Sequence, residues 1–222
     1  MAVFRVLENG TAFLVKSIRP EEEEEFIRLN PKGFIRVETY PPTRYDCYRY
    51  NSETKAIEID QECELLKHKE AQIAELNRKT KNFIAQTLKN LDWGDTYEEA
   101  LSELQNSALD TETRILYFLK PKIADITLTQ IREKIALYLA GQYTTEDLQK
   151  ELEKKGFTQE GIEKFLPLFA EAAEVASLIY WTEEVWKKEE ELEKAIEEAN
   201  SIEEIDQLMS SIQFPPPPGG EG

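Results

Sequence analysis

The stretch Ala56-Ile-Glu-Ile-Asp-Gln-Glu-Cys-Glu-Leu-Leu-Lys-His-Lys69 contains the point at which the chain changes character. Its first four residues alternate between apolar and polar side chains, which is typical of a half-buried β-strand. From Cys63 onward the apolar residues recur three to four positions apart, which is the spacing of an amphipathic helix. We therefore predict a boundary near residue 62, with strands almost confined to residues 2–60 and helices after them.

Before this boundary the sequence predicts a small antiparallel sheet. Asn9-Gly10 separates two alternating runs and is a strong hairpin signal, because both residues tolerate a positive φ. Five glutamates open the segment Glu21 to Leu29, which predicts a short helix because the helix dipole favours negative charge in the first turn. Alternation returns at Phe34 to Tyr40, and a second hairpin is expected around Asn51-Ser52-Glu53-Thr54. The predicted order of elements over residues 1–62 is ββαβββ.

After the boundary we predict a helical region over residues 63–212 and a Pro/Gly-rich tail over residues 213–222. The first helix should run from Cys63 to about Asn90, with a break between helices expected near Asp110. Further on, Pro167 is expected to kink a helix, and Thr182 is expected to cap a new one. The four prolines after Phe214 predict an extended, poorly packed end. The predicted fold class is α+β, mostly α.

The composition limits the classes of function. The chain has 222 residues, of which 41% are hydrophobic, and 44 acidic against 27 basic side chains give a net charge of −17. Such a surface repels phosphate, so we expect neither nucleic-acid nor anionic-membrane binding. Abundant Glu, Lys and Ile with two Met and two Cys is a mix often seen in heat-adapted proteins. With no long apolar run, a soluble protein is expected.

Few side chains of this sequence are suited to catalysis or metal binding. Cys47 and Cys63 do not predict a disulfide framework, and we expect a reducing compartment. These cysteines and His68, which is the single histidine, make only a partial zinc ligand set, so we expect no metal and no cofactor. His68 is expected to be an exposed residue on a helix. Glycine-rich phosphate loops and hydrolase motifs are absent from the sequence, so we predict neither an enzyme nor a small-molecule substrate.

Two features predict contact with other proteins. The long helix carries an apolar stripe that must be buried somewhere, and two tryptophans lie five residues apart in the acidic C-terminal half. The candidate partner-binding residues are Leu66, Ile73, Leu76, Phe83, Trp181 and Trp186.

One part of the chain resembles a known group of proteins. It comprises Tyr48-Arg-Tyr-Asn-Ser-Glu-Thr-Lys-Ala-Ile-Glu-Ile-Asp60, the helix from Cys63 to Leu91, and Asp92-Trp93. This pattern of a short hairpin, a charged helix and an aspartate-tryptophan turn resembles small tail-associated proteins of tailed bacteriophages, a group that includes tail-fibre assembly proteins. The similarity covers about residues 45–95, and the chain from Arg114 onward does not follow it.

The resemblance and the helical composition together lead to an expected function. We expect a non-enzymatic protein-binding component of a multi-subunit assembly, in the form of a bacteriophage virion or tail structural or assembly protein. The expected partners are other virion or tail proteins or a second copy of the chain, in the virion or the host cytoplasm. The alternative is an acidic inhibitor or regulatory adaptor that mimics DNA or blocks a host enzyme.

Overall fold

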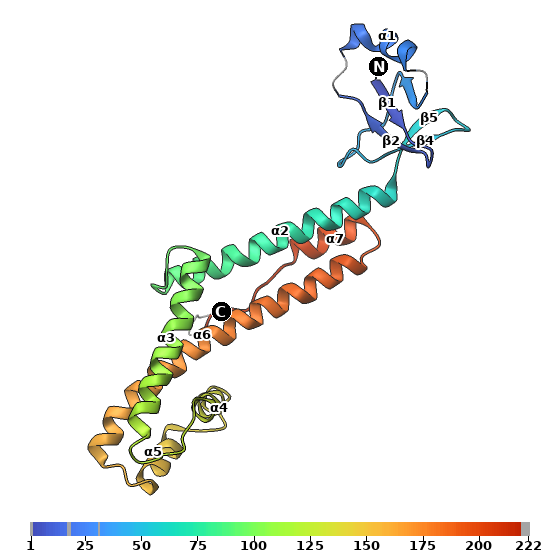
Figure 1. Cartoon of the computed structure of the whole chain (residues 1–222). Helices are drawn as coiled ribbons and strands as arrows, with labels where there is room; N and C mark the ends of the chain where they lie inside the picture. The colour runs from blue at the N-terminus through green and yellow to red at the C-terminus, as the bar shows by residue number, and fades with distance from the viewer. Residues whose placement is uncertain (1, 17–18, 31, 219–222) are drawn as a thin grey trace. The chain divides into compact units, whose positions relative to one another are not determined.

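The computed structural model describes residues 2–16, 19–30 and 32–218. The described residues form five strands and the short helix α1, then the long helix α2 and five more helices. Figure 1 shows the chain running from the strands into α2 and on through the helices that follow. All strands of the described residues end by Ile59, and α2 begins at Gln61. The predicted class, α+β and mostly α, is confirmed. Pro31 and the Gly219–Gly222 part of the predicted tail lie outside the described residues.

The five strands form one antiparallel sheet in the order β3-β1-β2-β4-β5. The strands are β1 (Ala2–Val6), β2 (Thr11–Leu14), β3 (Phe34–Val37), β4 (Tyr48–Asn51) and β5 (Ala56–Ile59). Between β2 and β3 the chain forms a 3-10 turn, η1 (Pro20–Glu22), and the helix α1 (Glu23–Leu29). The predicted ββαβββ order is therefore present, and β3 returns to pair with β1 on the side away from β2.

Local chemistry accounts for the first hairpin. Gly10 has a φ of +86°, which its missing Cβ permits, and its N–H donates to the Leu7 carbonyl at 3.0 Å. The turn sets the register in which Val6 faces Ala12. Phe4 is completely buried and lies edge-on to the Tyr48 ring at 5.0 Å. These contacts form the apolar core of the sheet.

The helices begin at capping residues that the sequence largely marks. They are α2 (Gln61–Asn90), α3 (Tyr97–Leu119), α4 (Leu128–Leu139), α5 (Thr145–Lys154), α6 (Gln159–Glu198) and α7 (Ile202–Ser210). Thr96, Thr127 and Thr144 each form a capping box with the residue three positions on. The threonine side chain accepts from a backbone N–H that would otherwise lack a partner at the helix start.

Two helices are longer than the sequence predicts. The expected break near Asp110 is wrong, because α3 continues through it, and Thr111 satisfies its hydroxyl by donating to the carbonyls of Ser107 and Ala108. The cap expected at Thr182 is wrong for the same reason, because its hydroxyl donates to the Ile179 carbonyl inside α6. Helix α6 also runs through Pro167.

The chain divides into two compact units. Unit 1 comprises Met1–Leu76 and Leu192–Ile212, and unit 2 comprises Asn77–Glu191 and Gln213–Gly222. Unit 2 has two apolar clusters. One joins the C-terminal half of α3 to α4, α5 and the start of α6, and the other joins the end of α2 to the start of α3 and the middle of α6.

Unit 1 contains a disulfide between Cys47, next to β4, and Cys63 in the first turns of α2. The two Cα atoms are 5.6 Å apart, which is within the range that a disulfide requires. The expectation that these cysteines do not form a disulfide is therefore wrong. The two cysteines are 16 positions apart, and the segment between them contains the β4–β5 hairpin, which brings the start of β4 back to the start of α2.

Candidate functional site

An aromatic cluster in unit 2 brings together two of the predicted partner-binding residues. Phe83 of α2 lies 5.8 Å from Trp181 of α6, measured between ring centroids, and the Phe214 ring stacks on Phe83 at 4.9 Å. The indole N–H of Trp181 donates to the Pro215 carbonyl at 2.9 Å. The start of the C-terminal tail is therefore held by a ring stack and a hydrogen bond. This differs from the poorly packed end that the sequence predicts.

The remaining predicted partner-binding residues lie in varied surroundings. Trp186 is half-buried, with its ring edge-on to Tyr97 at 6.0 Å. On α2, Leu66 is 58% exposed, Ile73 is half-buried and Leu76 is completely buried. The structure thus brings Phe83 and Trp181 together, and the role of the six residues in partner binding stays a prediction.

A second feature of unit 2 is an open groove of about 430 Å³. Its sides come from α3, α4 and α6, and it has an apolar floor and a polar rim. The lining residues are Gln105, Ala108, Leu109, Glu112, Arg132, Ala172, Ala176, Ile179, Tyr180 and Glu183. Leu109 is 51% exposed and Tyr180 is 40% exposed, so two large apolar side chains meet solvent at the groove. The small alanine side chains on the floor of the groove leave space between Leu109 and Tyr180.

The polar edge of the groove is fixed by a bidentate ion pair. Arg132 of α4 donates from Nε and Nη2 to the carboxylate of Glu112 of α3, at distances of 2.7 to 2.9 Å. Glu112 is almost completely buried, and its hydrogen bonds raise the pKa of Arg132. Two parallel hydrogen bonds between planar groups also fix their orientation. The pair therefore holds α4 at a defined position on α3.

Beside this core, Glu151 of α5 accepts hydrogen bonds from two neighbours. Lys134 of α4 donates at 2.5 Å and the Tyr143 hydroxyl at 2.7 Å, both to Oε2. Burial raises the pKa of Tyr143, and its bond to Glu151 raises it further. Burial alone would raise the pKa of Glu151, but the hydrogen bonds from Lys134 and Tyr143 outweigh burial and lower it. This cluster ties α5 to α4.

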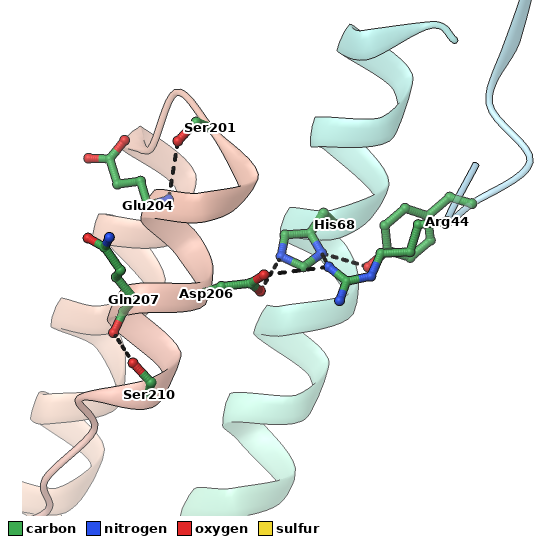
Figure 2. A network of polar contacts seen from close by, with 8 residues as sticks. Arg44, His68, Ser201, Glu204, Asp206, Gln207 and Ser210 are labelled. Atoms are coloured by element: carbon green, nitrogen blue, oxygen red, sulfur yellow. Dashed lines mark hydrogen bonds and ion pairs between the residues drawn. The ribbon is translucent and has the colours of Figure 1, made fainter. Parts of the chain in front are cut away.

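In unit 1 a polar network surrounds His68. Figure 2 shows the imidazole reaching from α2 towards Asp206 of α7, with Arg44 on its other side. His68 Nε2 lies 2.9 Å from Asp206 Oδ1, and Nδ1 lies 2.7 Å from the Tyr45 hydroxyl and 3.2 Å from Arg44 Nη1. The His68 side chain is completely buried, so the expectation of an exposed helical histidine is wrong. The cause is cover from α7 and from the loop before β4.

The partners of the His68 ring determine its tautomer. A guanidinium can only donate and a carboxylate only accepts, so Nδ1 accepts from Arg44 and Nε2 donates to Asp206. The Tyr45 hydroxyl, at 2.7 Å, donates to the same single lone pair of Nδ1, and Arg44 is the more distant of the two donors. Both ring nitrogens are occupied and the ring has no exposed surface. The arrangement therefore acts as a cross-link between α2, α7 and the loop before β4.

Further bonds hold this loop against α2. The Tyr45 N–H donates to Glu64 Oε1 at 3.0 Å, and Lys67 Nζ donates to the Tyr45 carbonyl at 3.0 Å. The Cys47–Cys63 disulfide lies next to them in the sequence. The loop is thus fixed at Tyr45 and at Cys47.

In the described residues, no set of three or more His, Cys, Asp or Glu side chains is placed to hold a metal ion. Within the same residues, no helix has both the length and the apolar character needed to cross a membrane. Comparison of the chain with protein-family models, with curated proteins and with solved structures finds no match.

Sequence reasoning missed the groove and the tail contact. Leu109 and Tyr180 lie on the long helices α3 and α6, and the residues near them in the sequence do not show that α4 leaves them exposed. Phe214 did carry a signal, because a lone aromatic residue before four prolines is an anchor that a helical bundle can bury.

Proposed function

We propose that this chain is a non-enzymatic protein-binding component of a multi-subunit assembly, such as a bacteriophage virion or tail. The observation that supports the proposal most is the groove between α3, α4 and α6, where Leu109 and Tyr180 remain exposed beside a floor of alanine and isoleucine. Exposed apolar anchors with a polar rim are typical of protein interfaces.

The chemistry of the groove indicates the kind of partner. A groove between helices accepts the apolar face of an amphipathic helix, whose side chains fit over small residues such as Ala172 and Ala176. Helix α6 carries 12 acidic and 4 basic side chains, and Glu183 lies on the groove rim. Basic residues flanking the partner helix would therefore steer its approach.

The resemblance of residues 45–95 to phage tail-associated proteins supports the choice of assembly. That stretch forms the β4–β5 hairpin, helix α2 and a turn in which Asp92 has a φ of +63°. The Trp93 N–H donates to the Leu88 carbonyl at 3.0 Å and so closes the end of α2.

The proposal is tested by light scattering of the purified chain, alone and mixed with candidate tail and tail-fibre proteins. Leu109→Lys and Tyr180→Lys place a charge in the groove, and Tyr117→Lys is the matched control, because Tyr117 is 69% exposed on α3 but does not line the groove. We expect complex formation that each groove variant weakens by at least ~30-fold, the cost of losing a ~2 kcal/mol anchor. The Tyr117 variant should bind as the wild type does.

A chain that binds none of these proteins would contradict the proposal. Equal loss of binding in the Tyr117 variant would show that added charge, rather than the groove, is responsible. Tight binding to a DNA-processing enzyme instead would favour the acidic inhibitor.

A further inference from the structure

Within unit 2, the C-terminal tail contacts helices α2 and α6 in the way that a bound peptide contacts a receptor. Phe214 inserts its ring against Phe83 with an interplanar angle of 23°, and the Pro215 carbonyl accepts the Trp181 indole N–H. Trp181 is only 3% exposed with the tail in place. Proteins recognise proline-rich peptides with aromatic rings and with side-chain donors such as an indole N–H. These donors find acceptors because the carbonyls of an extended proline backbone make no hydrogen bonds within the peptide.

The contact between the tail and the helices is small and local, so another peptide can replace the tail there. Phe214, Pro215 and Pro217 are half-buried, whereas Pro216 and Pro218 are exposed. The chain between α7 and the contact is also exposed at Ser211 and Gln213. Beside the contact lies an open hollow of about 410 Å³, lined partly by Lys187 and Lys188 of α6. A ligand longer than the tail therefore has space to continue.

We propose that Phe83 and Trp181 form a binding site for phenylalanine-proline-proline peptide segments of a partner protein, and that the chain's own tail is its resident competitor. The phenylalanine of the ligand takes the place of Phe214 on Phe83, and the carbonyl of the following proline accepts from Trp181. This site shares no lining residue with the α3–α4–α6 groove. It goes beyond the proposed function, and either can fail without the other.

Tethering predicts how strongly the tail competes. A short flexible connection gives a tethered ligand an effective concentration of about 1 mM. A free peptide with a Kd of about 0.1 mM should then bind the wild-type chain about tenfold more weakly than a chain whose tail has been disabled. The full-length Phe214→Ala variant provides that chain without any truncation.

The experiment titrates full-length proteins with a fluorescein-labelled peptide of the tail sequence Ser-Ile-Gln-Phe-Pro-Pro-Pro-Pro and follows fluorescence anisotropy. We expect Phe214→Ala to bind about tenfold more tightly than the wild type, and a peptide with alanine in place of phenylalanine not to bind. Adding Trp181→Phe to Phe214→Ala should weaken binding about fivefold through loss of one hydrogen bond. Trp93→Phe in the same background is the matched control and should leave binding unchanged, because Trp93 lies in the turn after α2 and its backbone N–H, which the substitution keeps, donates to Leu88.

Equal affinity of wild type and Phe214→Ala would overturn the competition, and unchanged binding in the Trp181→Phe variant would overturn the site itself. Circular dichroism establishes that each variant retains the helix content of the wild type. If Phe214→Ala loses helix, Phe214→Leu keeps more apolar bulk and is titrated in its place with the same expected order of affinities.

Discussion

Removing the Cys47–Cys63 disulfide should lower the stability of unit 1 by an amount that follows from its loop length. The two cysteines are 16 positions apart in the sequence. Closing a loop of that size lowers the conformational entropy of the unfolded chain, which raises the free energy of the unfolded state by about 3 kcal/mol at 25 °C. The Cys47→Ala/Cys63→Ala variant should therefore unfold with a free energy about 3 kcal/mol lower than that of the wild type.

The measurement is urea unfolding followed by far-UV circular dichroism, with and without a reductant. Because the unfolded variant is no longer cross-linked, it exposes more surface, and the dependence of its unfolding free energy on urea should be steeper. The reductant should shift the wild-type midpoint towards that of the double variant and leave the double variant unchanged, which makes the variant its own control.

Two results would refute this reasoning. One is titration of two reactive thiols in the native protein under non-reducing conditions, which would mean that the bond is absent. The other is a loss of less than about 1 kcal/mol in the variant, which would mean that other contacts already fix the loop before β4 in the unfolded ensemble.

Three further predictions follow from polar contacts. His68→Leu should lower the free energy of unfolding by about 1–3 kcal/mol, because it leaves the partly buried Tyr45 hydroxyl without its acceptor. Asp206→Ala should lower it less, because the Asp206 side chain is 49% exposed. Urea unfolding of the two variants compares these losses. Because the pKa of Glu151 is lowered in the folded chain, its contribution to stability is present above the usual carboxyl pKa of 4.5. That contribution is lost as the pH falls through the lower pKa of the folded state. Glu151→Gln should accordingly flatten the dependence of stability on pH below about pH 4.5, and an unchanged slope in melting experiments from pH 3 to 6 would count against the cluster. Thr144→Ala should cost about 1 kcal/mol by removing the capping box of α5, with hydrogen exchange in α5 as the readout, and unchanged exchange there would contradict it.

Local signals explain the parts of the fold that the sequence predicts well. The predicted hairpin at Asn9-Gly10 is correct because it depends on residues a few positions apart. The change from strand to helix near residue 62 is equally local. By contrast, the expected break near Asp110 failed because a threonine can satisfy its hydroxyl within a helix as well as at its start.

Non-local contacts explain the parts that it missed. On α2 the buried residues include a row at steps of four, Leu76, Thr80, Ile84 and Leu88, and the same row extended back towards the N-terminus reaches His68. Following that row would have indicated a buried His68, but its partners Arg44 and Asp206 lie 24 and 138 positions away. The disulfide and the tail contact likewise depend on long-range closure, which periodicity does not report.

The central claim, that the chain acts by binding other proteins in an assembly, is tested most directly by native mass spectrometry of the protein isolated from its source. The account predicts a complex heavier than the 25.7 kDa of one chain, containing at least one other polypeptide, which dissociates when Leu109 or Tyr180 is replaced by lysine. A species of 25.7 kDa alone, unchanged by those substitutions, would contradict it.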